Sequence, residues 1–402
     1  MADFYQNDLI ITLHRLGNPG LERVESELME FTRQRPVALV LPALVTEFEG
    51  EAIKGIVAEL KKVRYLREII LSLGRANDKE FQYVREFMSQ LPCEVKVIHN
   101  EGKRIKEIYA TLERNNVWPG EDGKGRSAWI SYGYVIANAQ SEVIALHDCD
   151  IVTYNRGMLA RLCYPVANPN IDVVFCKGFY SRITDKMHGR VTRLLITPLI
   201  RALQKIVGPN PFLMFLDSFR YPLAGEFAMI TDMARTNRIP WDWGLEVGVL
   251  SEVFRNYSTR RVCQVDIADN YEHKHQLLSA DDAQKGLMRM SVDICKSIFR
   301  FLAAEGIVLS DSFFKSLQVA YIRLAEDTMV KYEADAAING LKFDRHAEAS
   351  AAEAFSNAIK IASDTYSENP MAAPLIPNWN RVTSAIPGIL DMLKKAVDED
   401  NR

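Results

Sequence analysis

Two aspartates one residue apart follow a short apolar run in the middle of the chain. The run Val143–Leu146 ends in His147, and Asp148 and Asp150 come after it. Short apolar runs bounded by polar residues are typical of buried strands, and residues i and i+2 of a strand project to the same side. Two carboxylates placed together repel each other unless a divalent cation lies between them and a ligand. The pattern therefore indicates a metal–nucleotide site, although a three-residue pattern of this kind also occurs in solvated acidic turns.

A glycine-rich loop precedes this strand. Residues 119–125 read PGEDGKG, and a helix is expected over 126–139. A lysine in a glycine loop that leads into a helix N-terminus is a suitable place for a phosphate group. The loop has neither the P-loop spacing nor GxGxxG, so it supports neither an ATPase nor a Rossmann dehydrogenase.

Strand-like and helix-like segments alternate around these residues. We expect strands over 37–41, 68–73 and 94–99, and helices over 51–63, 79–90, 103–115 and 126–139. This alternation predicts an α/β fold with a parallel sheet, whose ligands bind beyond the carboxyl ends of the strands. Apolar residues at helical spacing between 8 and 34, including Leu9, Leu13 and Leu16, predict a helical N-terminal extension. The chain beyond Ser279 is expected to be almost wholly helical.

Composition narrows the class of protein. The 402 residues carry a formal net charge of −3 and no long basic tract, so nucleic acid is not an expected partner. The six cysteines form no CxxC pair, which favours reduced core thiols of a cytoplasmic protein over a zinc site. The N-terminus lacks the pattern of a secretory signal, and the apolar stretch 194–216 contains Arg201, Lys205 and three prolines. No membrane span is expected.

Seven motifs in a fixed order resemble the glucosyl-3-phosphoglycerate synthase family of retaining glycosyltransferases. The resemblance covers roughly residues 37–276, and the joint order is far more specific than any one motif. The motifs, in chain order, are Leu41-Pro42-Ala43-Leu44, Gly123-Lys124-Gly125, Asp148-Cys149-Asp150, Gly189-Arg190-Val191-Thr192, Pro222-Leu223-Ala224-Gly225-Glu226, Gly244-Leu245-Glu246-Val247-Gly248 and the region of His273.

The resemblance implies a fold and an activity. The fold would be a GT-A Rossmann-like mixed sheet flanked by helices. Three regions follow: a helical N-terminal extension (1–36), a GT-A catalytic domain (37–278) and a helical C-terminal region (279–402). The catalytic domain would divide into a nucleotide-sugar half (37–152) and an acceptor half (153–278). Family members transfer glucose from UDP-glucose to the 2-hydroxyl of 3-phosphoglycerate with retention, use Mg²⁺ (or Mn²⁺) and are typically homodimers.

The resemblance also implies roles for individual residues. Asp150 would bind the metal directly, His273 would complete the protein ligands, and Asp148 would hold the ribose or metal waters. Asp150, Glu246 and Asp148 are the expected catalytic residues. The expected nucleotide-sugar contacts are Pro42, Ala43, Leu44, Glu47, Ser72, Lys124, Gly125, Asp148 and Glu246, with Arg75 closing the base pocket. The expected acceptor contacts are Gly189, Arg190, Thr192, Lys274 and His275.

Physical chemistry fits these roles. A divalent cation stabilises a departing diphosphate as a Lewis acid. The planar fork of Arg190 suits a phosphate or carboxylate. Two departures stand out, because Val45-Thr46-Glu47 replaces the family's Asn-Glu and His273-Lys274-His275 replaces its His-Arg-Asn. The first alters a nucleotide contact and the second bears on the acceptor.

Several alternatives remain open at this point. A mannosyl-3-phosphoglycerate synthase that uses GDP-mannose would carry similar motifs. A sugar-phosphate nucleotidyltransferase shares paired acids on an α/β sheet, but its Gly-rich basic signature is missing before Val37. A non-catalytic nucleotide-sugar sensor could use the same fold. Retention is compatible with either a carboxylate nucleophile or a front-face route.

Overall fold

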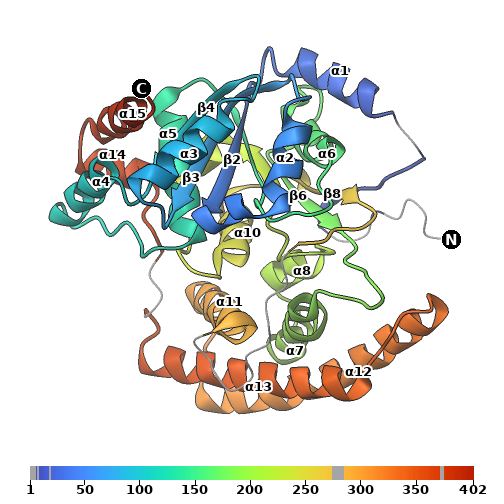
Figure 1. Cartoon of the computed structure of the whole chain (residues 1–402). Coiled ribbons are helices and arrows are strands. Elements are labelled where there is room, and N and C mark those ends of the chain that lie inside the picture. Colours follow the sequence, from blue (N-terminus) through green and yellow to red (C-terminus); the bar gives the residue numbers. More distant parts are fainter. Residues whose placement is uncertain (1–5, 7–8, 18–19, 274–284, 372–374) are drawn as a thin grey trace.

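A mixed eight-stranded sheet forms the centre of the computed structural model (Figure 1), which describes residues 6, 9–17, 20–273, 285–371 and 375–402. The strand order is β1-β8-β6-β7-β5-β2-β3-β4. The strands are β1 Ile11–Leu13, β2 Val37–Leu44, β3 Leu66–Gly74, β4 Glu94–His99, β5 Val143–Leu146, β6 Phe175–Tyr180, β7 Phe227–Ile230 and β8 Val262–Ala268. Strand β7 is antiparallel to both β5 and β6, and the other neighbouring strands are parallel.

The alternation of side chains along the buried strands divides the interior into two cores. In β2, Ala38 and Val40 belong to one core, whereas Val37, Leu39 and Leu41 belong to the other. The second core is covered by α1 Leu21–Phe31, α2 Glu51–Leu60, α3 Asp78–Met88 and α6 Arg156–Ala167. The first core contains α4 Lys103–Arg114, α5 Lys124–Asn138, α7 Thr197–Val207, α8 Pro211–Asp217, α9 Thr231–Thr236, α10 Leu245–Asn256 and the C-terminal helices. Because helices cover both faces of the sheet, we expect ligands to bind beyond the ends of its strands.

The predicted alternation of strands and helices between residues 37 and 139 is confirmed. The N-terminal extension differs from the prediction, because Ile11–Leu13 forms an edge strand parallel to β8 where a helix was expected. Gln264 donates a hydrogen bond of 2.9 Å to the Thr12 hydroxyl across this pair. Helical spacing in a short apolar segment is a weak signal, and pairing with a distant strand outweighs it. Only the second part of the extension, α1, is helical.

The C-terminal region is helical as predicted, but it packs in two places. Helices α11 Gly286–Ala304, α12 Asp311–Ile338 and α13 Arg345–Glu368 pack together below the sheet in Figure 1, and α12 also lies against α7. Helices α14 Trp379–Ala385 and α15 Ile389–Asp400 return to the other end of the sheet, where α15 contacts α4, α5 and β4. The Asn401 side chain bonds both backbone groups of Val97, at 2.9 and 2.8 Å. The end of the chain thus helps to cover the sheet.

No helix in the described part of the chain is long and apolar enough to cross a membrane.

Candidate active site

The candidate site lies where β5 and β6 end and β7 begins. Because β7 is antiparallel, Phe227 at its start lies opposite Leu146 in β5 and Lys177 in β6. The residues just before β7, Gly225 and Glu226, therefore reach the same edge of the sheet as the aspartate pair that follows β5. This register unites motifs that are about 75 positions apart in the sequence.

Lys124 joins two of the predicted catalytic carboxylates. Its Nζ lies 2.6 Å from Asp148 Oδ1 and 3.0 Å from Glu246 Oε1. Burial opposes charge on both partners, but the nearby carboxylates raise the pKa of Lys124 above its ordinary range and Lys124 lowers that of Asp148. The structure thus brings the predicted Lys124, Asp148 and Glu246 together in one charged network.

Asp150 and His273 approach each other across a short backbone pairing. Ile151 forms an antiparallel bridge with His273, and Asp150 Oδ2 lies 3.4 Å from His273 Nδ1. The other oxygen, Asp150 Oδ1, is buried and has no hydrogen-bond partner within the described residues. A buried carboxylate oxygen of this kind fits a cation ligand.

A metal held here would draw on few protein groups. Among the described residues, no cluster of three or more His, Cys, Asp and Glu side chains is arranged to hold a metal ion. Mg²⁺ is commonly bound by one or two protein groups together with substrate phosphates and water. The Asp150–His273 pair therefore suits a cation that arrives with a nucleotide diphosphate better than a structural metal.

Buried His147 precedes the aspartates and stays neutral. Burial lowers its pKa to about 4. Its Nδ1 lies 2.9 Å from the backbone oxygen of Asp148, and its ring packs 4.9 Å from that of Tyr154. His147 therefore contributes to the backbone position of Asp148 and adds no positive charge near neutral pH.

Two tyrosines that the sequence analysis missed hold Glu226. Its carboxylate accepts hydrogen bonds from the Tyr180 hydroxyl at 2.7 Å and the Tyr271 hydroxyl at 2.6 Å. The two rings stack with centroids 3.8 Å apart. Burial, reinforced by the charge of Asp148, raises the pKa of Glu226. The only sequence signal for these tyrosines is their place at or just after the ends of β6 and β8.

Lys177 is a second buried cation that the sequence analysis did not assign to the site. The side chain is fully buried, and its Nζ donates a 2.7 Å hydrogen bond to the backbone oxygen of Ala224. Burial lowers its pKa to about 8. Lys177 thus fixes the turn that presents Gly225 and Glu226.

Gly225 leaves room for the charged network, and this room gives a testable prediction. A Cβ at position 225 would lie 2.6 Å from Asp148 Oδ2 and 2.9 Å from Lys124 Nζ. We expect Gly225→Ala to lower kcat/KM by at least about tenfold, because a displacement of functional groups by a fraction of an ångström is costly to catalysis. Steady-state kinetics and thermal unfolding measure the two effects separately.

The matched control for this substitution is Gly55→Ala. Gly55 lies in α2, and a Cβ there would meet no atom within 4 Å. Alanine in a helix is intrinsically more favourable than glycine, so the control should keep full activity and a stability equal to or above that of the parent chain. Equal activity of the two variants would contradict the assigned role of Gly225.

The glycine-rich loop owes its composition to packing. A Cβ at Gly123 would lie 2.7 Å from the backbone oxygen of Trp241, and one at Gly125 only 2.0 Å from that of Pro240. The Gly125 amide donates to the Trp241 oxygen at 3.3 Å. The predicted amide contact of Gly125 with the nucleotide would therefore require this bond to break, and the loop's contribution to the described site is the Lys124 side chain.

The predicted nucleotide-base residues lie at the ends of β2 and β3. Pro42, Ala43 and Leu44 pair with Ser72, Leu73 and Gly74, and Glu47 lies in the short 3₁₀ helix Val45–Glu49 that follows β2. Ser72 is fully buried and its hydroxyl accepts a 2.9 Å hydrogen bond from Asn100, a residue that the sequence analysis missed.

Arg75 follows β3 and reaches toward the glycine-rich loop. Its backbone is left-handed, with φ of 58°, a conformation that is uncommon for residues other than glycine. Its Nε lies 3.5 Å from Asp122 Oδ2, and the side chain is 70% exposed. Arg75 therefore links the two loops that flank the predicted base pocket.

The predicted acceptor motif is tied to the C-terminal helices. Gly189 has φ of 75°, and Arg190 precedes the π-helical segment Val191–Ile196. Arg190 Nε donates to Glu348 Oε1 of α13 at 2.8 Å, and Arg193 Nη1 donates to Oε2 of the same carboxylate at 2.8 Å. Glu348 was not predicted from the sequence.

Three further residues were predicted to contact the acceptor, and the structure describes one of them, Thr192. Thr192 Oγ1 is buried and without a hydrogen-bond partner among the residues that the structure describes. Lys274 and His275 lie outside the described residues.

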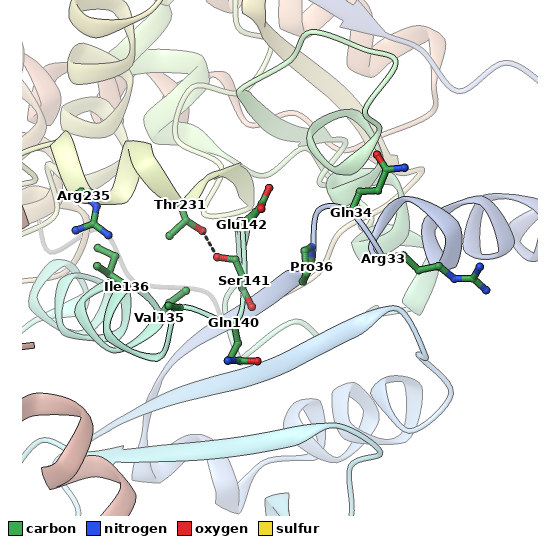
Figure 2. Close-up of a pocket in the computed structure, with 11 residues that line it drawn as sticks. Arg33, Gln34, Pro36, Val135, Ile136, Gln140, Ser141, Glu142, Thr231 and Arg235 are labelled. Atoms are coloured by element: carbon green, nitrogen blue, oxygen red, sulfur yellow. Dashed lines mark hydrogen bonds between the residues drawn. The ribbon is translucent and has the colours of Figure 1, made fainter. Parts of the chain in front are cut away.

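A cavity of about 480 Å³ lies at the opposite ends of the strands from the candidate site, where β2 and β5 begin (Figure 2). Pro36 and Glu142 line it beside the starts of β2 and β5, and Thr231 donates a 2.9 Å hydrogen bond to the backbone oxygen of Ser141 there. Ligands of open α/β sheets bind at the carboxyl ends of the strands. This cavity is therefore separate from the candidate active site.

The mixed sheet with helices on both faces is the fold of the GT-A glycosyltransferases. Solved structures with this fold include glucosyl-3-phosphoglycerate synthase from Mycobacterium tuberculosis in complex with Mg²⁺ and UDP, with a TM-score of 0.52, 20% identity and coverage of 75% of this chain and 88% of that one. Mannosyl-3-phosphoglycerate synthase from Rubrobacter xylanophilus has a TM-score of 0.55 at 21% identity, over 71% of this chain and 80% of that one.

Sequence relatives narrow this class to a family. The chain is 50% identical to glucosyl-3-phosphoglycerate synthase from Persephonella marina, over 100% of this chain and 99% of the relative. It is 36% identical to the synthase of the same name from Methanococcoides burtonii, over 99% and 98% of the two chains. No protein-family model matches the chain. The chain belongs to the glucosyl-3-phosphoglycerate synthase family and is a glycosyltransferase.

Proposed function

We propose that this chain transfers glucose from UDP-glucose to the 2-hydroxyl of 3-phosphoglycerate, with retention at the anomeric carbon and with help from Mg²⁺ or Mn²⁺. The observation that carries the proposal is the 50% identity to the Persephonella marina synthase, which extends over 100% of this chain. Solved structures of the Mycobacterium tuberculosis synthase in complex with Mn²⁺, UDP-glucose and phosphoglyceric acid support the same donor and acceptor.

Asp150 and His273 would hold the metal in this proposal. A bound divalent cation would act as a Lewis acid that stabilises the charge of the departing diphosphate. The buried Asp150 Oδ1, which has no hydrogen-bond partner among the described residues, supports this assignment. Lys124 would offset part of the negative charge of Asp148 and Glu246. Asp148 could then receive the ribose or metal-bound water, and Glu246 the hydroxyls of the donor sugar.

Arg190 would bind the phosphate or carboxylate of the acceptor, with Gly189 and Thr192 beside it. Glu348 uses the Nε of Arg190, which leaves the fork of terminal nitrogens to meet an anion. We expect Glu348→Gln to raise the KM for 3-phosphoglycerate by roughly three- to tenfold, because a neutral amide holds the guanidinium more weakly. The KM for UDP-glucose should stay unchanged.

Lys342→Ala is the matched control for this prediction. Lys342 pairs with Asp185 at 2.9 Å and also joins the acceptor half to the C-terminal region, but its side chain is 80% exposed. Exposed ion pairs contribute little, so both KM values should stay at the level of the parent chain. A KM for 3-phosphoglycerate that rises equally in both variants would contradict a specific role of Glu348.

A donor-by-acceptor matrix tests the function as a whole. UDP-glucose and GDP-mannose are each combined with 3-phosphoglycerate, glycerate or no acceptor, with and without Mg²⁺, and nucleotide diphosphate release is measured. We expect release with UDP-glucose, 3-phosphoglycerate and Mg²⁺ together. Release with GDP-mannose and 3-phosphoglycerate, but not with UDP-glucose, would favour the mannosyl synthase. The Rubrobacter xylanophilus member of that class shares the fold. Pyrophosphate release from a nucleoside triphosphate and a sugar phosphate would identify a nucleotidyltransferase.

We also propose that the enzyme is a cytoplasmic homodimer. The six cysteines are all free, which agrees with a reducing compartment. Helix α12 exposes Val319, Val330 and Ile338, by 74, 53 and 84%, and apolar side chains of this kind are enriched where subunits meet. Light scattering of the full chain measures its mass, and the mass of a monomer would contradict the dimer.

A further inference from the structure

A second cavity, of about 400 Å³, lies between α10, α11 and the end of α13, and Pro370, Met371 and Leu375 also line it. Phe301 and Tyr366 contribute aromatic surface to its lining, and Met371 and Leu375 contribute aliphatic surface. A space of this volume lined largely by apolar groups is the size and character of a small-molecule site.

Three arginines line the same cavity. Arg238 is paired with Glu252 at 3.0 Å, and Asp242, the other acid of the lining, accepts a hydrogen bond from the Gly244 amide. Arg255 and Arg300 have no ion pair with any of the described residues. The lining therefore holds three guanidinium groups and two carboxylates, an excess of one positive charge.

Arg300 shows the imbalance most clearly. Its Nη1 is buried and has no hydrogen-bond partner among the residues that the structure describes. Burial and the charge of Arg238 lower the pKa of the Arg300 guanidinium, and the two acids of the cavity, Glu252 and Asp242, oppose that shift only in part. A buried donor without an acceptor is costly, and guanidinium presents its donors in a fork that matches phosphate and carboxylate.

We propose that this cavity binds a small anionic ligand, with a phosphate or carboxylate on Arg255 and Arg300 and an aromatic or apolar body against Phe301 and Tyr366. The inference does not depend on the function proposed above. The ligand class follows from the lining, because the excess guanidinium charge and the aromatic surface recognise the two ends of such a molecule.

The cavity is distinct from the candidate active site, although one wall is shared. Pro240 lines the cavity and lies against Gly248, where a Cβ would come within 2.3 Å of the proline ring. The other side of the Pro240–Trp241 segment packs on Gly123 and Gly125, which flank Lys124. The ligand would therefore lie behind the segment that supports the lysine.

Binding of phenyl phosphate to the full chain tests the proposal. Inorganic phosphate and phenol are titrated separately as comparison ligands, because they carry only the anionic and only the aromatic part of phenyl phosphate. Isothermal titration should show one saturable site for phenyl phosphate in the parent chain and in Arg190→Ala, whose acceptor site is disabled. Arg255→Ala and Arg300→Met should each weaken binding by about tenfold or more, since each removes a charge-assisted contact. Exposed Arg260 lies outside the cavity, so Arg260→Ala should leave the affinity unchanged.

Three results would overturn the proposal. They are no saturable binding by the parent chain, binding that disappears in Arg190→Ala, and equal affinity of the parent chain and a folded Arg255→Ala variant. Arg255 is exposed, so its replacement keeps the test open even where Arg300→Met fails to fold. Inorganic phosphate that binds as tightly as phenyl phosphate would also contradict the aromatic part of the inference.

Discussion

Replacement of Asp150 by asparagine is expected to lower kcat/KM by on the order of 10²–10³-fold, because it removes the charge that would hold the metal against the departing diphosphate. Asparagine has nearly the shape of aspartate, so the bridge between Ile151 and His273 should persist. UDP release at increasing Mg²⁺ concentration measures the loss. Thermal unfolding confirms that the variant is folded.

Metal removal provides an independent version of the same test. EDTA should lower the activity of the parent chain to a comparable level, and added Mg²⁺ should restore it, whereas Asp150→Asn should respond weakly to either. Asp172→Asn is the matched control, because Asp172 is 77% exposed and pairs with Arg261 on the surface. An Asp150→Asn variant whose kcat/KM is within tenfold of that of the parent chain would show that Asp150 is not a metal ligand.

The prominence of Asp150 was predictable from the sequence because its signal is local. An apolar run followed at once by two acids predicts both the strand and the residue at which it ends. The alternation of strands and helices from 37 to 139 is similarly local, since each apolar face repeats within one element. Together these patterns predict the sheet and the strand end at which Asp148 and Asp150 lie.

The partners of the predicted residues were not predictable, because they depend on the pairing of distant strands. Tyr180 and Tyr271 meet at Glu226 only because β6, β7 and β8 are neighbours in a particular register. Glu348 comes from a helix more than 150 positions beyond Arg190. Periodicity identified that helix but gave no information about which residue it faces.

The glycine-rich loop shows how a local pattern can mislead. Its glycines suggested a phosphate cradle, yet the structure explains Gly123 and Gly125 by the close passage of Pro240 and Trp241. Close approach of another backbone and close approach of a phosphate both require glycine. The glycines therefore cannot tell a backbone contact from a phosphate contact. The residue of this loop that reaches the candidate site is Lys124, which contacts Asp148 and Glu246.

Lys124→Met is accordingly expected to affect both activity and stability. Methionine keeps the apolar stem of the side chain but removes the charge that lies 2.6 Å from Asp148 and 3.0 Å from Glu246. Loss of one member of a largely buried ionic network should destabilise the fold by about 2 kcal/mol at neutral pH. The kcat/KM should fall by on the order of 10²-fold, because the donor would meet unneutralised carboxylates.

The stability loss should depend on pH with a definite sign. In the parent chain Lys124 lowers the pKa of Asp148, so this group contributes stability above the unfolded pKa of about 3.9 and loses it as the pH falls further. In the variant, burial without the lysine would raise the pKa of Asp148 above its unfolded value. The variant would then lose stability as the pH rises through the range between the two values.

The difference in stability between the two proteins should therefore be largest near pH 7 and smaller near pH 5. Urea unfolding of both proteins at these two pH values measures it. Lys54→Met is the matched control, because Lys54 forms an exposed pair with Glu51 in α2 and its loss should change little at either pH. A difference that stays the same at pH 5 and pH 7 would show that Lys124 does not stabilise the fold through the charge of Asp148. A Lys124→Met variant with the kcat/KM of the parent chain would show that Lys124 has no role in catalysis.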